Sequence, residues 1–186
     1  SKEIRFETDE GTWMAVDVSP DGKSIAFDLL GDIYTIPIAG GDATLISGGT
    51  PYETQPRFSP DGTRISFTSD RDGVENIWTM RPDGSDRKQV THEKERQLNN
   101  AVWTPDGRYL VISNNGWSKP SLTIVDTEQQ YVKARVPIEP YVSDAPGLAE
   151  QDPEVFWEAV CAACRTLWEM PGVRRESVAA VALTTQ

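Results

Sequence analysis

The chain has 186 residues, enough for one large domain or two small ones with a substantial core. Its 38% apolar and 25% charged residues are typical of a globular protein, and its net charge of −11 disfavours nucleic acids and anionic membrane surfaces as partners. No stretch approaches the roughly 18 apolar residues of a transmembrane span, so we expect no membrane insertion.

Three copies of one repeat follow along the chain. They read VSPDGKSIAFDL at 18–29, FSPDGTRISFTS at 58–69 and WTPDGRYLVISN at 103–114. In each copy an apolar strand ends in Ser or Thr, Pro-Asp-Gly makes a turn, and alternating apolar residues begin the next strand. Pro fixes φ, Asp can accept a hydrogen bond from nearby backbone, and Gly accepts a positive φ.

Each repeat continues with further strands, for example 32–38 in the first unit and 76–81 in the second. About four strands in roughly 40 residues is the size of one propeller blade. The sequence therefore predicts a mainly β fold with three four-stranded propeller-like blades, an incomplete propeller within 1–127. The blades are expected around 12–49, 50–92 and 97–127.

The repeat resembles that of TolB-type β-propellers. The likeness is carried by the SPDG turns followed by Ile-x-Phe, by SDRDGVENIWTM and by RPDGSD, and it covers about residues 4–127. The opening GTWMAVDVSPDGKSIAFDLLGDIYTIPIAGG also resembles the propeller that precedes some bacterial amidohydrolase domains. The resemblance implies a propeller fold and says little about activity.

The pattern changes after about residue 131. A strand is expected at 131–139, where it could add to the third blade as an outer strand. Asp152 is a good N-cap, and Pro153 suits a first helical turn. An apolar stripe then recurs at helical spacing, formed by Trp157, Val160, Cys161, Cys164, Leu167 and Trp168. Pro171-Gly172 ends the helix, and SVAAVALTTQ is typical of a buried strand. We therefore expect a strand–helix–strand α/β fragment at 128–186.

This C-terminal segment resembles the start of the FGGY carbohydrate kinases. The residues that carry the likeness are Gly147, Glu150, Gln151, Asp152, Pro153 and Trp157. The resemblance implies an actin-like kinase-domain fragment over about 128–186. Two unrelated family patterns in one chain suggest a chimera, built deliberately or made by a fused reading frame, with its join between Asn114 and Tyr131.

The kinase resemblance implies a phosphate loop of the type Asp-x-Gly-Thr-x-Ser. The nearest stretch is NNGWSKPSLTIVD, where Asn114, Gly116 and Ser118 would form a degraded loop. Asn114 stands where the acid is expected, and Trp117 would fill the phosphate's space; the alternative is an ordinary propeller hairpin. The chain stops at Gln186, before the sugar-contacting and catalytic residues that the resemblance implies, so we expect no kinase activity and no cofactor.

Other candidate sites have plain structural alternatives. Asp70, Asp72 and Glu75 lie together in SDRDGVEN, loosely like a calcium loop, but the stretch is shorter than an EF-hand loop and is also usual hairpin chemistry. Cys161 and Cys164 form a CxxC spacing that could be redox-active, although small apolar residues on a buried helix face explain them better.

No catalytic residues are predicted elsewhere. The only histidine, His92, lies among charged residues, so a Ser-His-Asp site is not expected. Trp13, Trp78 and Trp103 fall within strand patterns and are expected to pack in the core or between blades. Metal ions are likewise not expected.

A blade buries its faces only against neighbouring blades, so three blades leave two faces open. We expect either a homodimer that completes a ring or a monomer capped by its own tail. The predicted function is a non-enzymatic scaffold or interaction module; the alternative is a truncated sugar kinase with residual carbohydrate or nucleotide binding. The propeller resemblance implies an envelope or secreted location and the kinase resemblance a cytoplasmic one, so location stays open.

Overall fold

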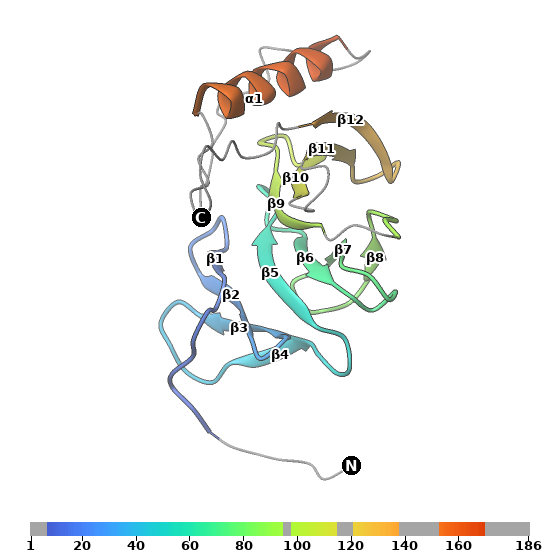
Figure 1. Cartoon of the computed structure of the whole chain (residues 1–186). Coiled ribbons are helices and arrows are strands. Elements are labelled where there is room, and N and C mark those ends of the chain that lie inside the picture. Colours follow the sequence, from blue (N-terminus) through green and yellow to red (C-terminus); the bar gives the residue numbers. More distant parts are fainter. Residues whose placement is uncertain (1–6, 95–97, 115–120, 138–152, 170–186) are drawn as a thin grey trace, which may run out of the picture.

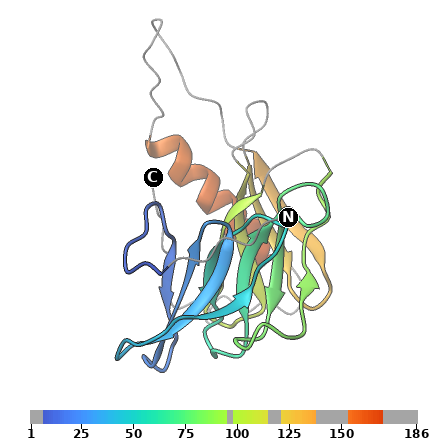
Figure 2. The ribbon, with the colours of Figure 1, turned by 90° about the horizontal axis from the view of Figure 1, so that it is seen from below.

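A computed structural model describes residues 7–94, 98–114, 121–137 and 153–169 of the chain. Within them, twelve strands form three four-stranded antiparallel sheets, each with its strands in chain order. The sheets, called blade 1, blade 2 and blade 3 below, lie one after another, as Figures 1 and 2 show. The prediction of three four-stranded blades is confirmed.

The strands of the three blades have the following bounds. Blade 1 consists of β1 (Val16–Val18), β2 (Ser24–Leu29), β3 (Asp32–Pro37) and β4 (Thr44–Ser47). Blade 2 consists of β5 (Glu53–Phe58), β6 (Ile65–Ser69), β7 (Asn76–Met80) and β8 (Lys88–Gln89). Blade 3 consists of β9 (Asn99–Trp103), β10 (Tyr109–Asn114), β11 (Ser121–Asp126) and β12 (Tyr131–Pro137).

The last strand of blade 3, β12, pairs with β11 along its whole length, from Asp126 opposite Tyr131 to Ser121 opposite Pro137. The segment expected at 131–139 is therefore the outer strand of the third sheet. The single helix of the described residues, α1 (Pro153–Trp168), begins at the predicted first-turn residue Pro153, while the predicted stop at Pro171-Gly172 lies outside the described residues. The predicted N-cap Asp152 and the predicted strand near the C-terminus lie outside the described residues.

Two apolar clusters lie between the blades. The first joins Ala26, Ile33 and Ile46 of blade 1 to Phe58, Ile65, Phe67, Met80 and the half-buried Trp78 of blade 2. The second lies between blades 2 and 3. It consists of Ile77 and Val90 on the side of blade 2, Leu98 just before β9, and Ala101, Leu110, Ile112, Val125 and the half-buried Trp103 of blade 3. The core of the molecule is thus a set of interfaces between sheets, as period-2 alternation requires.

A third, smaller cluster lies between blade 3 and α1. Val160 of α1 is 5% exposed and packs on Leu122 of β11, with Val111 and Cys164 against them. Leu110 and Ile112 contact blade 2, whereas Val111 between them points to the other face, towards the helix. Figure 1 shows α1 beyond blade 3, at the end of the stack opposite blade 1.

Three sequence-based expectations about side chains need correction. Trp13 is fully exposed and has φ of 61°, so it lies outside the core. Trp157 is 52% exposed, although it was placed on the buried stripe of the helix. Cys161 and Cys164 are free thiols that are only half-buried. Trp13 lies in a bend before β1, so the strand expected there is not formed. For the helical residues the spacing was right locally, but the extent of the covering surface is set by tertiary contacts.

The outer parts of blades 1 and 2 meet at a glycine, which generates a prediction. Gly84 lies in the β7–β8 turn with φ of 81°, and a Cβ there would overlap the carbonyl oxygen of Ile46. Gly73 has φ of 90°, but a Cβ there would have no neighbour within 4 Å. We expect Gly84→Ala to lower the free energy of unfolding by roughly 1–3 kcal/mol more than Gly73→Ala does.

Urea unfolding followed by circular dichroism measures both variants. Each substitution carries the strain of an L-residue at positive φ, so their difference isolates the contact with β4. Equal losses of stability would contradict this account of the blade 1–blade 2 contact.

Candidate interaction surfaces

The three Pro-Asp-Gly turns share one hydrogen-bonding scheme. The amide of Gly22, Gly62 or Gly107 donates to the carbonyl of the Ser or Thr three residues earlier, each at 2.8 Å. The Asp of each turn accepts hydrogen bonds from that hydroxyl, at 2.5–2.6 Å, and from the backbone amide two residues later, at 3.0–3.1 Å. The hydrogen bond from Ser59 is the main reason why the pKa of Asp61 is lowered, and Ser19 does the same for Asp21.

The same turns contact one another from blade to blade. A Cβ on Gly62 would lie 3.5 Å from Cδ of Pro20, and a Cβ on Gly107 would lie 3.7 Å from Cδ of Pro60. The proline of one blade therefore lies against the glycine of the following blade. The equivalent glycine of blade 1, Gly22, has nothing within 4 Å of a Cβ position.

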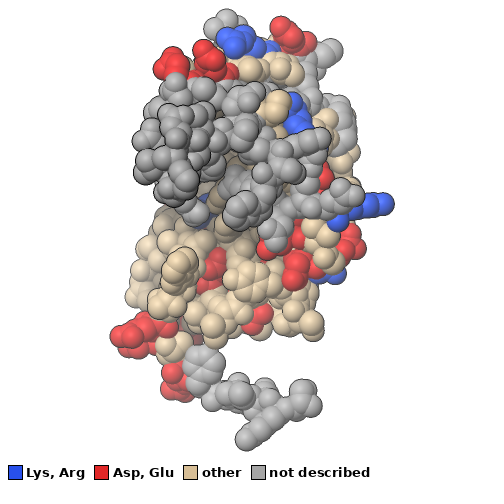
Figure 3. Space-filling model, in the orientation of Figure 1, with Lys and Arg blue, Asp and Glu red and all other residues tan. Residues whose placement is uncertain are grey.

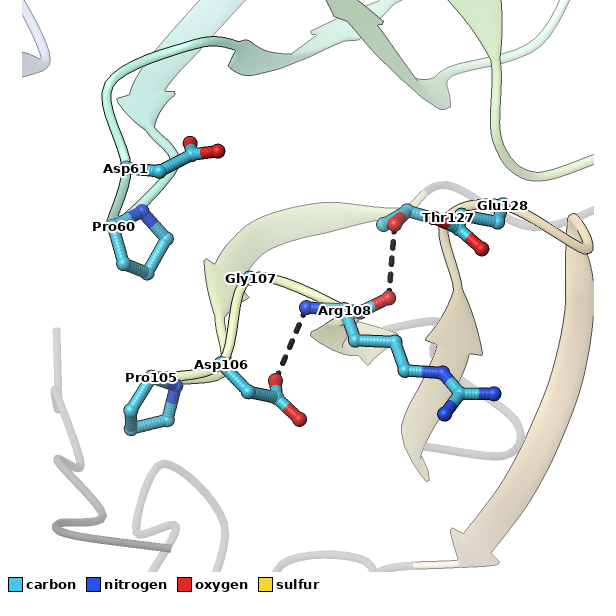
Figure 4. A pocket seen from close by; sticks show the side chains of 8 residues that line it. All are labelled: Pro60, Asp61, Pro105, Asp106, Gly107, Arg108, Thr127 and Glu128. Atoms are coloured by element: carbon cyan, nitrogen blue, oxygen red, sulfur yellow. Dashed lines mark hydrogen bonds between the residues drawn. The ribbon is translucent and has the colours of Figure 1, made fainter. Parts of the chain in front are cut away.

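A shallow groove of about 700 Å³ lies between the turns of blades 2 and 3. Figure 4 shows its lining residues, which are Pro60, Asp61, Pro105, Asp106, Gly107, Arg108, Thr127 and Glu128. Most of its polar groups take part in turn structure: Arg108 N donates to Asp106 at 3.1 Å, and the Thr127 hydroxyl donates to Arg108 O at 2.8 Å. Neither His nor Cys is among its lining residues.

A larger candidate surface is the side of blade 1 that faces away from blade 2. We call it the outer face of blade 1. Its residues are Val16, Val18, Ile25, Phe27, Tyr34, Ile36 and Leu45, which lie opposite one another across the strands. Val16 is 55% exposed and Val18 is 48% exposed. Figure 3 shows mostly uncharged residues, with a few acidic ones among them, over blade 1.

Repeat register indicates what this face is. Ile25 and Phe27 stand five and seven residues after Pro20, as Ile65 and Phe67 stand after Pro60. Ile65 and Phe67 are fully buried against blade 1, whereas Ile25 and Phe27 are only half-buried. The Phe27 and Tyr34 rings stack on each other, 5.6 Å apart. The outer face of blade 1 is therefore an apolar surface of the kind that the two other blades bury.

A buried ion pair that sequence reasoning missed joins β5 to the β6–β7 turn. Glu53 is fully buried and forms a salt bridge with Arg71, whose guanidinium lies over the Trp78 ring at 5.0 Å from the centroid. The Ser69 hydroxyl donates to Glu53 at 3.2 Å. The SDRDG motif marked this turn, but nothing local marked Glu53, which lies 18 residues before Arg71.

Of the three residues considered as calcium ligands, Asp70 and Asp72 accept hydrogen bonds from the protein itself. Asp70 accepts a hydrogen bond from the backbone amide of Tyr52 at 2.7 Å, and Asp72 accepts one from the side-chain amide of Gln89 at 3.2 Å. Burial, followed by the charge of Asp70, raises the pKa of Glu75 above its ordinary value. The described residues contain no group of three His, Cys, Asp or Glu that could hold a metal ion.

The remaining predicted site residues are dispersed. Asn114 is the last residue of β10, is fully buried and pairs with Ser121 of β11, while Gly116 and Ser118 lie outside the described residues. His92 is exposed. Burial, with a smaller effect of Cys161, raises the pKa of the Cys164 thiol, which disfavours the thiolate that redox chemistry needs. Among the described residues, the helix is too short and too polar to cross a membrane.

Sheets of four antiparallel strands that meet face to face, with the first strands on one side and matching turns at one end, define part of a β-propeller. The chain belongs to the family described as the Tricorn protease N-terminal beta propeller domain, which matches residues 12–141. The match includes β12 and therefore extends beyond residue 127.

Individual relatives agree with this assignment. The chain is 35% identical over 97 residues to Tricorn protease homolog 1 of Streptomyces coelicolor, covering 52% of this chain and 9% of that protein. It is 40% identical over 77 residues to an uncharacterized protein of Agrobacterium fabrum, covering 39% and 26%. The chain thus spans only a small part of these relatives.

Solved structures share the fold. TolB from Acinetobacter baumannii superposes with a TM-score of 0.57 at 24% identity, over 73% of this chain and 34% of that one. A puromycin hydrolase superposes with a TM-score of 0.58 at 17% identity, over 73% and 23%. At these identities the likeness is one of architecture.

The lowered pKa of Asp61 leads to a prediction about pH. A carboxyl with a lowered pKa in the folded chain stabilises the fold above its ordinary pKa, and this contribution disappears as the pH falls through the lowered value. We expect Asp61→Asn to lower the Tm at pH 7 by a few degrees, and the difference from the parent chain to vanish near pH 2.

Thermal scans from pH 7 down to pH 2 measure this difference. Asp42→Asn, which removes a carboxylate from an exposed loop, is the matched control and should change the Tm little throughout. A difference for Asp61→Asn that stayed constant with pH would contradict the proposed role of the charge.

The buried ion pair leads to a second prediction. Arg71→Met leaves the buried Glu53 carboxylate without its counter-charge, and we expect a loss of about 3 kcal/mol in the free energy of unfolding. The double variant Glu53→Gln/Arg71→Met should recover part of the loss, because no uncompensated charge stays buried. Arg81→Met, in a largely exposed ion pair with Asp86, should cost less than about 1 kcal/mol. Urea denaturation at pH 7 compares the three variants.

Proposed function

We propose that this chain is a non-catalytic β-propeller module that acts through its blade surfaces. The observation that carries the proposal is the outer face of blade 1. Ile25 and Phe27 occupy repeat positions that are fully buried in blade 2, yet both are only half-buried here. Three further apolar residues of this face, Val16, Val18 and Leu45, are about half exposed. An apolar surface of this kind on a soluble protein marks an interaction site.

The use of carboxylates inside the stack supports this proposal. Asp17 of β1 accepts a hydrogen bond from Phe58 N of β5, and Asp28 of β2 accepts one from Gln55 N, both at 2.7 Å. Glu53 is engaged by Arg71. These acidic groups join neighbouring strands, which leaves them unsuited to act as general acids or bases towards a substrate.

The relatives favour a second candidate, the accessory propeller of a hydrolase. One relative is named a protease homolog, and one structure of the same architecture is a puromycin hydrolase. In such a protein the propeller would recruit or admit peptide-like substrates, and the reaction would take place in another part of the molecule. The small share of the relatives that this chain spans supports a modular role of this kind.

The likeness to FGGY kinases gives an alternative for the part of the predicted 128–186 fragment that follows residue 141, where the propeller family match ends: a fragment of a chimera with residual carbohydrate or nucleotide binding. Its motif residues from Gly147 to Asp152 lie outside the described residues, and α1 is consistent with the first helix of such a domain. The proposed module makes no use of such a ligand. A binding measurement therefore distinguishes the two candidates.

We expect isothermal titration with magnesium-ATP and with pentoses to give no heat above dilution. We also expect an apolar dye such as anilinonaphthalene sulfonate to bind, and Phe27→Glu to lower its fluorescence because the charge interrupts the outer face of blade 1. Leu30→Glu, at a 79% exposed position in the β2–β3 turn, is the control and should leave the signal unchanged. Saturable heat with a sugar or nucleotide, or dye fluorescence unaffected by Phe27→Glu, would contradict the proposal.

A further inference from the structure

We propose that α1 occupies the place of a fourth blade, and that its release lets the outer face of blade 1 of a second copy dock on blade 3. Two copies that make this contact with each other at both ends would close a ring of six blades. The inference rests on the proposed function, since it names a second copy of the chain as the partner of the interaction surface.

The first argument is the position of Leu122. In each repeat, the residue eight positions after the turn proline pairs with an apolar residue of the next strand. Ser113, after Pro105, pairs with Leu122. The corresponding residues after Pro20 and Pro60 pair with Ile33 and Ile77. Ile33 packs against blade 2 and Ile77 packs against blade 3. Leu122, at the same repeat position, packs against Val160 of α1. The helix therefore covers the site that a following blade covers in the two preceding repeats.

The second argument is the complementary face. Leu110 and Ile112 of blade 3, like Ile65 and Phe67 of blade 2, are buried by the preceding blade. Ile25 and Phe27 are their equivalents on blade 1, where the described residues provide no preceding blade. Blade 1 thus has an apolar face that a preceding blade would bury, and blade 3 has a face that a following blade would bury.

The turns supply a third argument, because they favour a blade of the same type over other apolar partners. Pro20 lies against Gly62 and Pro60 lies against Gly107, whereas Gly22 is open. In the proposed contact, Pro105 of one copy would meet Gly22 of the other and repeat the same pairing. Substituting a side chain at Gly22 would obstruct this contact.

Closure at two copies follows from the number of blades. A contact between two different surfaces is head-to-tail, and it gives a ring only if the rotation closes. Propellers have typically about 4–8 blades. The three blades of the described residues reach this range in two copies and exceed it in three. A dimer is therefore the expected assembly.

The helix α1 competes with a second copy for the same face of blade 3, and its covalent attachment to blade 3 favours it. Residues 138–152 connect β12 to α1, and a short tether of this kind gives an effective concentration of about a millimolar. At micromolar protein concentration α1 should therefore keep its place. Of its described residues, Val160 and Cys164 pack in the cluster on blade 3 while Trp157 stays largely exposed. Weakening this small contact should shift the balance towards the dimer.

Sedimentation velocity between 1 and 100 µM tests the proposal on the full chain. We expect the parent chain to sediment as a 20.6 kDa monomer and Val160→Asp to form dimers with at least tenfold higher affinity. Thr166→Asp, at an exposed position of α1, should behave as the parent chain. Adding Val18→Asp to Val160→Asp should restore the monomer, whereas adding Leu30→Asp should not.

A folded but monomeric Val160→Asp chain would overturn the proposal. So would dimers that persist when Val18→Asp is added, or assemblies of more than two copies. Should Val160→Asp fail to fold, hydrogen exchange of the parent chain gives the answer. Exchange of the α1 amides should become faster as the protein concentration rises towards the millimolar range, and exchange independent of concentration would overturn the inference. Dye binding to the outer face of blade 1 without any dimer would leave the interaction module standing and reject only the second copy as its partner.

Discussion

Each blade of this protein has two apolar faces, and a neighbour has to cover each of them. Ala26 and Phe27 are adjacent in β2 but belong to opposite faces, one buried against blade 2 and the other half-exposed. Burying a side chain such as Ile or Phe contributes about 1.5–3 kcal/mol, so an uncovered face forgoes a large part of the available stability. The interfaces between blades, the helix on blade 3 and the open face of blade 1 all follow from this one constraint.

Polar contacts fix how the blades meet. The register of β5 shifts between Thr54 and Arg57, and Gln55 has φ of 58° there; Asn100 has φ of 53° at the equivalent place in β9. Such a conformation is unfavourable for a residue other than Gly, but it frees a backbone amide from the ladder. Asp28 accepts from Gln55 N at 2.7 Å, and the Gln55 side chain accepts from Asn100 N at 2.7 Å. Blades 1 and 2 therefore each carry a side-chain acceptor for the irregular amide of the next blade.

The contrast between what the sequence predicted and what it missed has a physical basis. The Pro-Asp-Gly turns, the strand alternation and the start of α1 depend on neighbours within a few residues, and they were predictable. The Glu53–Arg71 pair and the Asp28–Gln55 contact join residues 18 and 27 positions apart, and no local pattern marks them. The exposure of Trp157 was missed for a related reason: the spacing of apolar residues gives the direction of a side chain, whereas neighbouring elements decide how far it is covered.

Electrostatics distinguishes the two ways of covering an open blade face. The chain carries a net charge of −11, so two copies repel each other before their apolar faces meet, and salt screens this repulsion. The attached helix, with Glu154 in its first turn and Arg165 in its last, meets no such approach barrier because it is part of the same chain. Apolar burial is short-ranged and independent of charge sign, whereas the repulsion weakens with ionic strength. An intramolecular cover is therefore favoured most at low salt, and a cover from a second chain gains as salt increases.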